Sequence, residues 1–234
     1  MSGMLTAPYQ EFAREKLGFE FENINLLVTA LTHRSYVNEH RKSVSEHNER
    51  LEFLGDAVLE LVVTDFLFRS YNEAEGILTS WRASLVRTES IGEAGQLLGY
   101  EPLVRMSRGE KQGSERARLQ ILANAFEALI GAIYLERGYE DAAAFITKHI
   151  SSKLENILED GSWRDPKSHL QEVMQKIDSV TPRYIVLEEV GPDHDKVFTL
   201  GVYAGERLVS KGTGPSKQAA QQEAAKAALK IYQR

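Results

Sequence analysis

HNERLEFLGDAVLELVVT, residues 47 to 64, is the stretch that decides how this chain folds. Its apolar residues recur every three or four positions, and this spacing predicts a helix with one buried face. The residues of that face are Leu51, Leu54, Val58, Leu61 and Val62. Three acids, Glu49, Glu52 and Asp56, stand at offsets of zero, three and seven, so they form one stripe along the same helix.

The acidic stripe needs an explanation, because like charges at this spacing weaken a helix by roughly a few tenths of a kcal/mol per pair. A solvated acidic face is one interpretation. A bound divalent cation is the other, since Mg²⁺ prefers clustered carboxylate oxygens. Gly55, in mid-helix, costs roughly 1 kcal/mol relative to alanine and indicates that another backbone, a subunit or a ligand comes close.

Residues 48–56, NERLEFLGD, resemble the signature helix of the bacterial ribonuclease III family, which are Mg²⁺-dependent endonucleases of double-stranded RNA. The resemblance implies that Glu49, Glu52 and Asp56 are catalytic and bind the metal. Residues 31–36, LTHRSY, resemble a second segment of the family, for which we expect a structural role beside the signature helix.

The length and composition restrict the class of protein. A chain of 234 residues suits one large or two modest domains. The absence of cysteine excludes disulfides, thiol nucleophiles and thiolate metal sites. The first residues lack the pattern of a signal peptide, and no apolar run reaches the roughly 18 residues of a membrane span. We therefore expect a soluble, cytoplasmic protein without a membrane partner.

The charge is unevenly spread along the chain. The net charge is −6, but residues 164–234 carry +2 and residues 1–163 carry −8. An acidic segment followed by a mildly basic one fits a metal-binding catalytic domain joined to a module that binds a polyanion.

Residues 119–135, LQILANAFEALIGAIYL, are apolar on nearly all sides and predict a central core helix. Asn124 and Glu127 interrupt it three residues apart, hence on one face. An ionised glutamate there costs roughly several kcal/mol unless it is paired, for example with Arg50, or binds a metal. Glu127 is the better candidate for a catalytic metal ligand, because an acidic helix already exists to meet it. Ribonuclease III more often has Asp where this chain has Asn124, whose amide oxygen would ligate Mg²⁺ more weakly.

Helical periodicity also predicts the other elements of this part of the chain. They are two short helices within residues 8–33, a polar loop to Val44, the signature helix to about residue 69, one amphipathic segment at 78–98, and a last helix at 141–158. The resemblance assigns Glu75, in the turn after the signature helix, to the metal site. Arg108 and Lys111 lie in an irregular basic segment at 99–113 and are candidate phosphate contacts.

Residues 165–234 predict a helix that begins at Asp165-Pro166, three strands at 184–190, 197–203 and 207–210, and a final helix. This α-β-β-β-α order resembles a double-stranded-RNA-binding domain. The resemblance assigns RNA contacts to Gln171, Glu172, His194 and Lys217. A phosphate at the N-terminus of the last helix would reconcile Lys217 with the helix dipole, while Gln171 and His194 could reach 2′-hydroxyls.

Phe53 is a candidate contact between two copies of the chain. It lies off both the core stripe and the acidic stripe, and leaving it in water forgoes roughly 1.5–3 kcal/mol. It must therefore complete its own core or pack against a second copy. Members of the family join their subunits through this helix, so we expect a homodimer with Phe53 in the interface.

The whole pattern predicts an all-α ribonuclease III endonuclease domain at 1–158, a linker at 159–164, and a small α+β double-stranded-RNA-binding domain at 165–234. The resemblance implies Mg²⁺-assisted hydrolysis of duplex RNA, with Mn²⁺ as a substitute and no small-molecule cofactor. It implies products with 5′-phosphate and 3′-hydroxyl ends, and ribosomal RNA precursors and messenger RNAs as substrates. A duplex-RNA-binding regulator that does not cleave is the alternative, and it depends on Asn124.

Overall fold

The computed structural model describes residues 2–161, 163–192 and 196–232. The chain divides into two compact units, Met1–Trp163 and Arg164–Arg234, which we call the helical domain and the C-terminal domain. The division falls inside residues 159–164, the segment for which we predict a linker. His194, a predicted RNA contact, lies outside the described residues.

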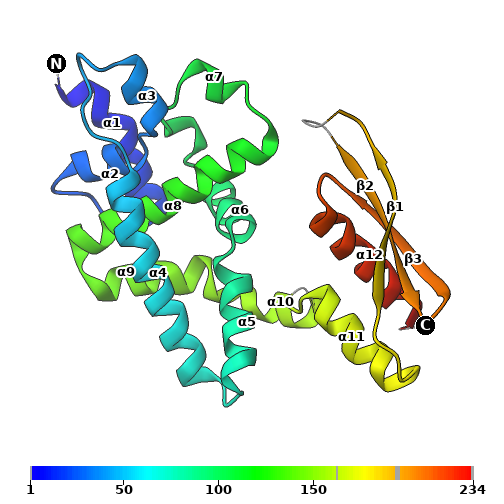
Figure 1. The fold of residues 1–234 in the computed structure, drawn as a ribbon. Coiled ribbons are helices and arrows are strands. Elements are labelled where there is room, and N and C mark those ends of the chain that lie inside the picture. Colours follow the sequence, from blue (N-terminus) through cyan, green and yellow to red (C-terminus); the bar gives the residue numbers. More distant parts are fainter. Residues whose placement is uncertain (1, 162, 193–195, 233–234) are drawn as a thin grey trace. The chain divides into compact units, whose positions relative to one another are not determined.

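The helical domain consists of helices joined by short turns (Figure 1). The α-helices are α1 (Ser2–Phe12), α2 (Ile24–Ala30), α3 (Arg34–Glu39), α4 (Glu49–Ser70), α5 (Glu75–Val86), α6 (Thr88–Leu98), α7 (Arg108–Lys111), α8 (Glu115–Arg137), α9 (Tyr139–His149) and α10 (Leu154–Asp160). A π-helical turn, Ala13–Leu17, follows α1, and short 3₁₀ helices occupy Glu101–Leu103 and Ser151–Lys153.

The centre of this domain is α8, as its apolar sequence predicts. Helices α2, α4, α6 and α9 all pack against it. Leu129, Ile130 and Ile133 are completely buried. By length and composition α8 could cross a membrane, but 61% of its most apolar window is buried inside the domain. The apolar character of α8 is thus accounted for by its position in the protein core.

Two glycines let α4 and α8 cross with their backbones in contact. A Cβ atom on Gly55 would lie 1.7 Å from the carbonyl oxygen of Glu127. A Cβ atom on Gly131 would lie 2.3 Å from the carbonyl oxygen of Leu51. Of the three explanations open for Gly55, the approach of another backbone is therefore the correct one.

Several predicted boundaries differ from the structure. The amphipathic segment at 78–98 is two helices, α5 and α6, because Arg87 is extended between them (ψ 149°). The predicted loop before Val44 contains α3, which begins at His33, whose Nδ1 accepts from the amide of Ser35 at 3.3 Å. The segments 99–113 and 141–158 are likewise divided into short helices. Leu61 is not part of the buried face of α4, since 57% of it is exposed.

The C-terminal domain has the predicted α-β-β-β-α order. Its elements are α11 (Pro166–Ile177), β1 (Arg183–Val190), β2 (Val197–Ala204), β3 (Arg207–Gly214) and α12 (Lys217–Tyr232). The strands form an antiparallel sheet in the order β1-β2-β3. The alanines of α12 bring it close to the sheet, so that a Cβ atom on Gly212 would lie 2.1 Å from the amide nitrogen of Ala224. Leu170, Met174 and Val202 complete this second core.

The crossing of α4 and α8 predicts that Gly55→Ala destabilises the protein. The new methyl group would collide with the backbone of α8, which cannot move aside as a flexible side chain can. Overpacking costs about 1–3 kcal/mol, and we expect a loss in the free energy of unfolding at the upper end of that range. Urea denaturation followed by circular dichroism measures it.

Gly76→Ala in α5 is the matched control, because nothing lies within 4 Å of its Cβ position. Its free energy of unfolding should be unchanged or slightly higher, since alanine favours helix more than glycine does. An equal loss of stability in both variants would contradict the role assigned to Gly55.

Candidate functional site

The contact between α4 and α8 brings predicted site residues of the two helices together. Burial, and then the charges of Asp56 and Glu52, raise the pKa of Glu127 to about 7. Burial, followed by the charges of Glu49 and Asp56, also raises the pKa of Glu52. Glu127 thus interacts electrostatically with acids that precede it by 71 and 75 positions in the sequence, Asp56 and Glu52. Arg50 is exposed and lines a neighbouring groove, so the alternative pairing of Glu127 with a core Arg50 is wrong.

Asn124 lies in the same cluster and is held by its own helix. Its Oδ1 accepts a hydrogen bond of 2.7 Å from Nε2 of Gln120, one turn earlier on α8. The Asn124 side chain also bonds to the carboxylate of Glu52, and this bond opposes the rise of the Glu52 pKa. Sequence reasoning missed Gln120, although its i,i+4 spacing from Asn124 is the signal for such a contact.

Glu49 stands at the first turn of α4, on the solvent side of the cluster. Its carboxylate lies 3.3 Å from Nη1 of Arg34 and 3.8 Å from Nδ1 of His47. The segment before α4 anchors this end of the helix, because the amide of Asn48 donates to the carbonyl oxygen of Thr32 at 2.9 Å. Residues 31–36, LTHRSY, therefore lie beside the start of α4, which fits the structural role that we expect for them.

Glu75 does not join this cluster within one chain. It is the first residue of α5, beyond the far end of α4. The fourteen residues from Asp56 to Ser70 alone span about 21 Å at 1.5 Å per residue. Glu75 instead lines a separate groove of about 540 Å³ with Phe68 and Arg82. The shared metal site that the resemblance implies for Glu75 is not formed by a single chain.

The donor chemistry at the crossing fits a hard divalent cation. The side chains that would face the metal all carry oxygen ligands, which Mg²⁺ prefers. They are those of Glu52, Asp56, Glu127 and Asn124. Among the residues that the structure describes, no three His, Asp or Glu side chains already converge as a ligand set. Carboxylates repel one another when no cation lies between them, so these side chains would have to draw together around it.

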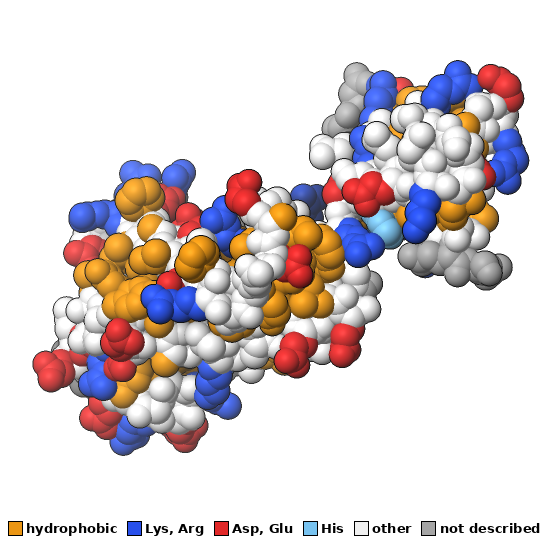
Figure 2. All heavy atoms as spheres, turned by 90° about the horizontal axis from the view of Figure 1, so that it is seen from below, with side chains coloured by type: hydrophobic (Ala, Val, Ile, Leu, Met, Phe, Trp, Pro, Cys, Tyr) orange, Lys and Arg blue, Asp and Glu red, His pale blue; other side chains and the backbone are white. Residues whose placement is uncertain are grey.

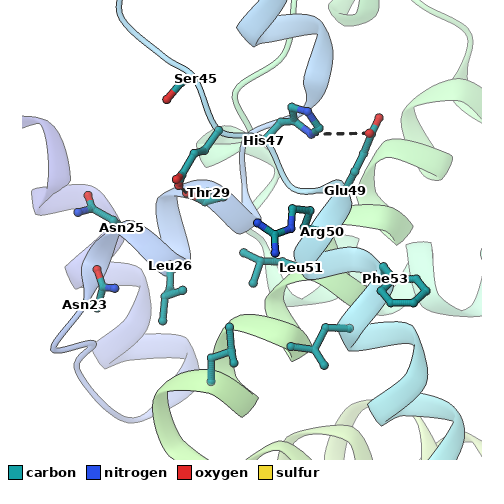
Figure 3. Close-up of a pocket in the computed structure, with 13 residues that line it drawn as sticks. Asn23, Asn25, Leu26, Thr29, Ser45, His47, Glu49, Arg50, Leu51 and Phe53 are labelled. Atoms are coloured by element: carbon teal, nitrogen blue, oxygen red, sulfur yellow. Dashed lines mark hydrogen bonds and ion pairs between the residues drawn. The ribbon is translucent and has the colours of Figure 1, made fainter.

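A groove of about 910 Å³ opens beside the first turns of α4 (Figure 3). Its walls come from α2, the segment at 45–47, α4 and the end of α8, and include Leu26, Leu51, Leu54 and Leu135. Phe53 stands on α4 at this groove with 81% of its surface exposed. Phe53 therefore does not complete the core of its own chain.

The predicted basic segment exposes two basic side chains on α7, and two further arginines in or near it contact other side chains. Arg108 and Lys111 are exposed on α7, which Ser107 caps by accepting from the amide of Glu110 at 3.2 Å. Arg105 instead lies over the ring of Tyr36, 4.3 Å from its centroid. Arg118 pairs with Glu101.

The C-terminal domain exposes the predicted RNA contacts that the structure describes. Gln171 and Glu172 are exposed on α11. Lys217 is the first residue of α12, beside Ser216, whose Oγ accepts from the amide of Ala219 at 3.1 Å. The Nζ atom of Lys217 lies 4.0 Å from a Glu189 carboxylate oxygen, so this cation is near a carboxylate when no phosphate is bound.

Both domains match known family models. Residues 23–154 match the model described as Ribonuclease-III-like, and residues 166–232 match the double-stranded RNA binding motif. The helical domain is also similar to the nuclease domain of ribonuclease III from Campylobacter jejuni, a structure described for flexibility in a region involved in dimer formation. That match has a TM-score of 0.53 and 41% identity, and it covers 59% of this chain and 96% of the other.

Curated relatives extend the similarity over nearly the whole chain. Ribonuclease 3 of Carboxydothermus hydrogenoformans is 45% identical over 216 residues, which is 92% of each chain. Ribonuclease 3 of Listeria monocytogenes is 41% identical over 94% of this chain and 96% of the relative. Identity at this level, across both the helical and the C-terminal domain, establishes that the chain belongs to the ribonuclease III family.

Proposed function

We propose that this chain is an endoribonuclease that hydrolyses phosphodiester bonds of double-stranded RNA with Mg²⁺, or Mn²⁺ in its place. The products would carry 5′-phosphate and 3′-hydroxyl ends. One observation carries the proposal: the crossing at Gly55 sets the carboxylates of Glu52 and Asp56 against Glu127 in a chain that also has a double-stranded RNA binding motif.

The helical domain would supply the chemistry. Glu52, Asp56 and Glu127 would hold the cation, with Glu49 at the edge of the site and Asn124 bridging Glu52 to its own helix. A bound divalent cation would activate the attacking water and offset the negative charge of the transition state. A pKa of about 7 leaves the Glu127 carboxyl about half protonated at pH 7 without a cation, and cation binding would favour its ionised form.

The alternative, a binder of duplex RNA that does not cleave, depends on the neutral Asn124. Four carboxylates, those of Glu49, Glu52, Asp56 and Glu127, remain at or beside the crossing. The amide of Asn124 still has a defined place, between Gln120 and Glu52. We therefore favour cleavage, with a weaker hold on the metal than an aspartate would give.

Duplex RNA would be bound by the exposed polar residues of both domains. Lys217 and the free amides at the start of α12 would meet a phosphate, while Gln171 and Glu172 on α11 face solvent as a minor-groove contact requires. Arg108 and Lys111 on α7 would add phosphate contacts from the helical domain. The substrates that we propose are structured transcripts such as ribosomal RNA precursors and messenger RNAs, cut in the cytoplasm.

A homodimer would explain the apolar surface of α4. Phe53, Leu61 and Phe68 are 81%, 57% and 76% exposed, and their spacing of eight and seven residues puts them on one side of the helix. Figure 2 shows that hydrophobic side chains also gather in patches on one face of the helical domain. A two-fold arrangement would place each Phe53 in the groove of the other copy, a contact made twice. Gly55, which packs against α8, has no part in this contact.

The stability of the metal-free protein should depend on Glu127. Its pKa is about 7 in the folded chain and near 4.5 when unfolded, so between these values the folded state holds a proton that the unfolded state has lost. In EDTA, the free energy of unfolding should therefore fall as pH rises from about 4.5 to 7. Glu127→Gln, which does not titrate, should flatten this slope in urea denaturation.

Glu73→Gln removes the same charge from an exposed site outside the cluster and is the control. Its stability should follow the wild-type slope. A Glu127→Gln protein with an unchanged slope would show that Glu127 ionises normally.

Substitutions of Glu127 and Asn124 on α8 should change cleavage in opposite directions. With saturating Mg²⁺, Glu127→Gln should lower the rate on duplex RNA by about 100-fold or more, because several kcal/mol of charge stabilisation are lost. Binding of the duplex should persist. Asn124→Asp should lower the Mg²⁺ concentration needed for half-maximal rate. Normal turnover of the first variant, or an unchanged Mg²⁺ requirement of the second, would remove that residue from the ligand set.

Lys217 should contribute to affinity through a phosphate. Each phosphate neutralised makes the logarithmic salt dependence steeper by roughly 0.9, so Lys217→Ala should flatten the slope by about one unit. Lys226→Ala changes the same charge later on α12, where Glu223 pairs with it at 2.7 Å, and should leave the slope unchanged. Fluorescence anisotropy with labelled duplex RNA measures both. Equal slopes for the two variants would place the phosphate elsewhere.

Phe53→Ala should weaken association and double-strand cleavage together. The expected loss is about 1.5–3 kcal/mol for each phenylalanine that leaves its partner's groove. Leu97→Ala on α6 removes a side chain that is equally exposed (83%) and should leave association unchanged. Sedimentation velocity across a range of concentrations measures the dimer. A Phe53→Ala protein that still sediments as a dimer below micromolar concentration would contradict the assignment.

A further inference from the structure

The chain leaves the helical domain at a tryptophan that is packed against that domain. Helix α10 ends at Gly161, which is left-handed (φ 69°). Trp163 then lies against Trp81 of α5, with ring centroids 5.9 Å apart and planes at 86°. Trp81 is 7% exposed, and Trp163 packs on the main core of the helical domain. Trp163, which lies within the predicted linker, is therefore part of this domain.

Trp163 completes a series of perpendicular aromatic contacts. Trp81 meets Tyr71 at 5.2 Å and 84°, and Tyr71 meets Phe66 at 6.2 Å and 78°. Edge-to-face pairs of this kind stabilise beyond the area that they bury. The series joins the exit point of the chain to α5 and to the end of α4.

The indole N–H of Trp81 favours the position of Trp163 against its ring. This nitrogen is buried and has no hydrogen-bond partner among the residues that the structure describes. A perpendicular aromatic ring is the arrangement in which an N–H group can face a π surface, a weak hydrogen bond. Trp163 would thus cover a donor that water cannot reach.

The next residue is already attached to the C-terminal domain. Nη1 of Arg164 lies 3.5 Å from Nδ1 of His169 on α11. Asp165 caps the same helix, and its Oδ2 accepts from the amide of Ser168 at 2.9 Å. The attachment points of the two domains are therefore neighbours in sequence, at Trp163 and Arg164.

We propose that Trp163 is a positioning residue that anchors the linker on Trp81 and keeps the tether of the RNA-binding domain to about one residue. This inference rests on the proposed function, cleavage of duplex RNA. A short tether raises the effective concentration of the second module at an RNA that the first has met. Releasing Trp163 would extend the free tether back toward the end of α10, while Arg164 stays attached to α11. Because effective concentration falls as about the −3/2 power of tether length once the tether exceeds the span that it bridges, we expect a severalfold decrease.

The anchor can be tested without activity, because the chain has only two tryptophans. In full-length Trp81→Phe, Trp163 is the sole indole, and its fluorescence should be blue-shifted and protected from acrylamide. In Trp81→Ala the packing surface is lost, and the emission should move to that of free tryptophan. Solvent-like emission already present in Trp81→Phe, in a protein with native circular dichroism, would overturn the anchor.

The role in RNA cleavage is tested by KM and kcat on a long duplex in Mg²⁺. Trp163→Ala should raise KM severalfold at constant kcat, and Trp163→Phe should restore most of it. Four Gly/Ser residues inserted between Trp163 and Arg164 should raise KM similarly while the fluorescence stays native. An unchanged KM in both variants, or a loss of kcat alone in Trp163→Ala, would overturn the tether role. A wild-type protein that does not cleave would contradict the proposed function but leave the fluorescence test intact.

Discussion

The contact between the backbones of α4 and α8 is the constraint on which the rest of the helical domain depends. Gly55 and Gly131 lack the Cβ atoms that would hold the helices apart, and each lies against a carbonyl oxygen of the other helix. This short separation brings polar residues of α8, the central helix of the domain, beside the acids of α4. The same packing provides the rigid support that a catalytic site needs.

Packing, rather than electrostatic attraction, holds the acidic cluster together. Burial and neighbouring carboxylates raise the pKa of both Glu52 and Glu127, so the arrangement is unfavourable for charged side chains without a cation. A nearby core of aliphatic side chains, including Val58 and Leu129, stabilises the crossing against this repulsion. The cluster thus lowers the stability of the metal-free fold, a cost that is typical of functional sites.

The exposed apolar surfaces of the helical domain indicate how two chains would associate. A second copy could cover the exposed phenylalanines of α4 and fill the groove beside Phe53. Trp163, in contrast, already packs against Trp81 of its own domain. Under our proposals, aromatic residues would act at two levels: one set would join chains, and the other would fix where the RNA-binding domain is attached. Both sets lie on α4, which carries the signature sequence, on the following helix α5, or beside these two helices.

The sequence by itself determined the two-domain organisation, the family, the helical course of residues 49–70 and the α-β-β-β-α order, because periodicity and motifs are local properties. It also indicated that Glu127 would meet the acids of α4. Only the tertiary structure decided that Gly55 faces α8 rather than a second subunit, that Leu61 is exposed, and that Glu75 lines a separate groove beyond the far end of α4. Periodicity gives the face on which a residue lies, but it does not give the element that covers that face. The position of Trp163 could not be predicted from the sequence for the same reason, since it depends on a contact with Trp81, which is distant in the chain.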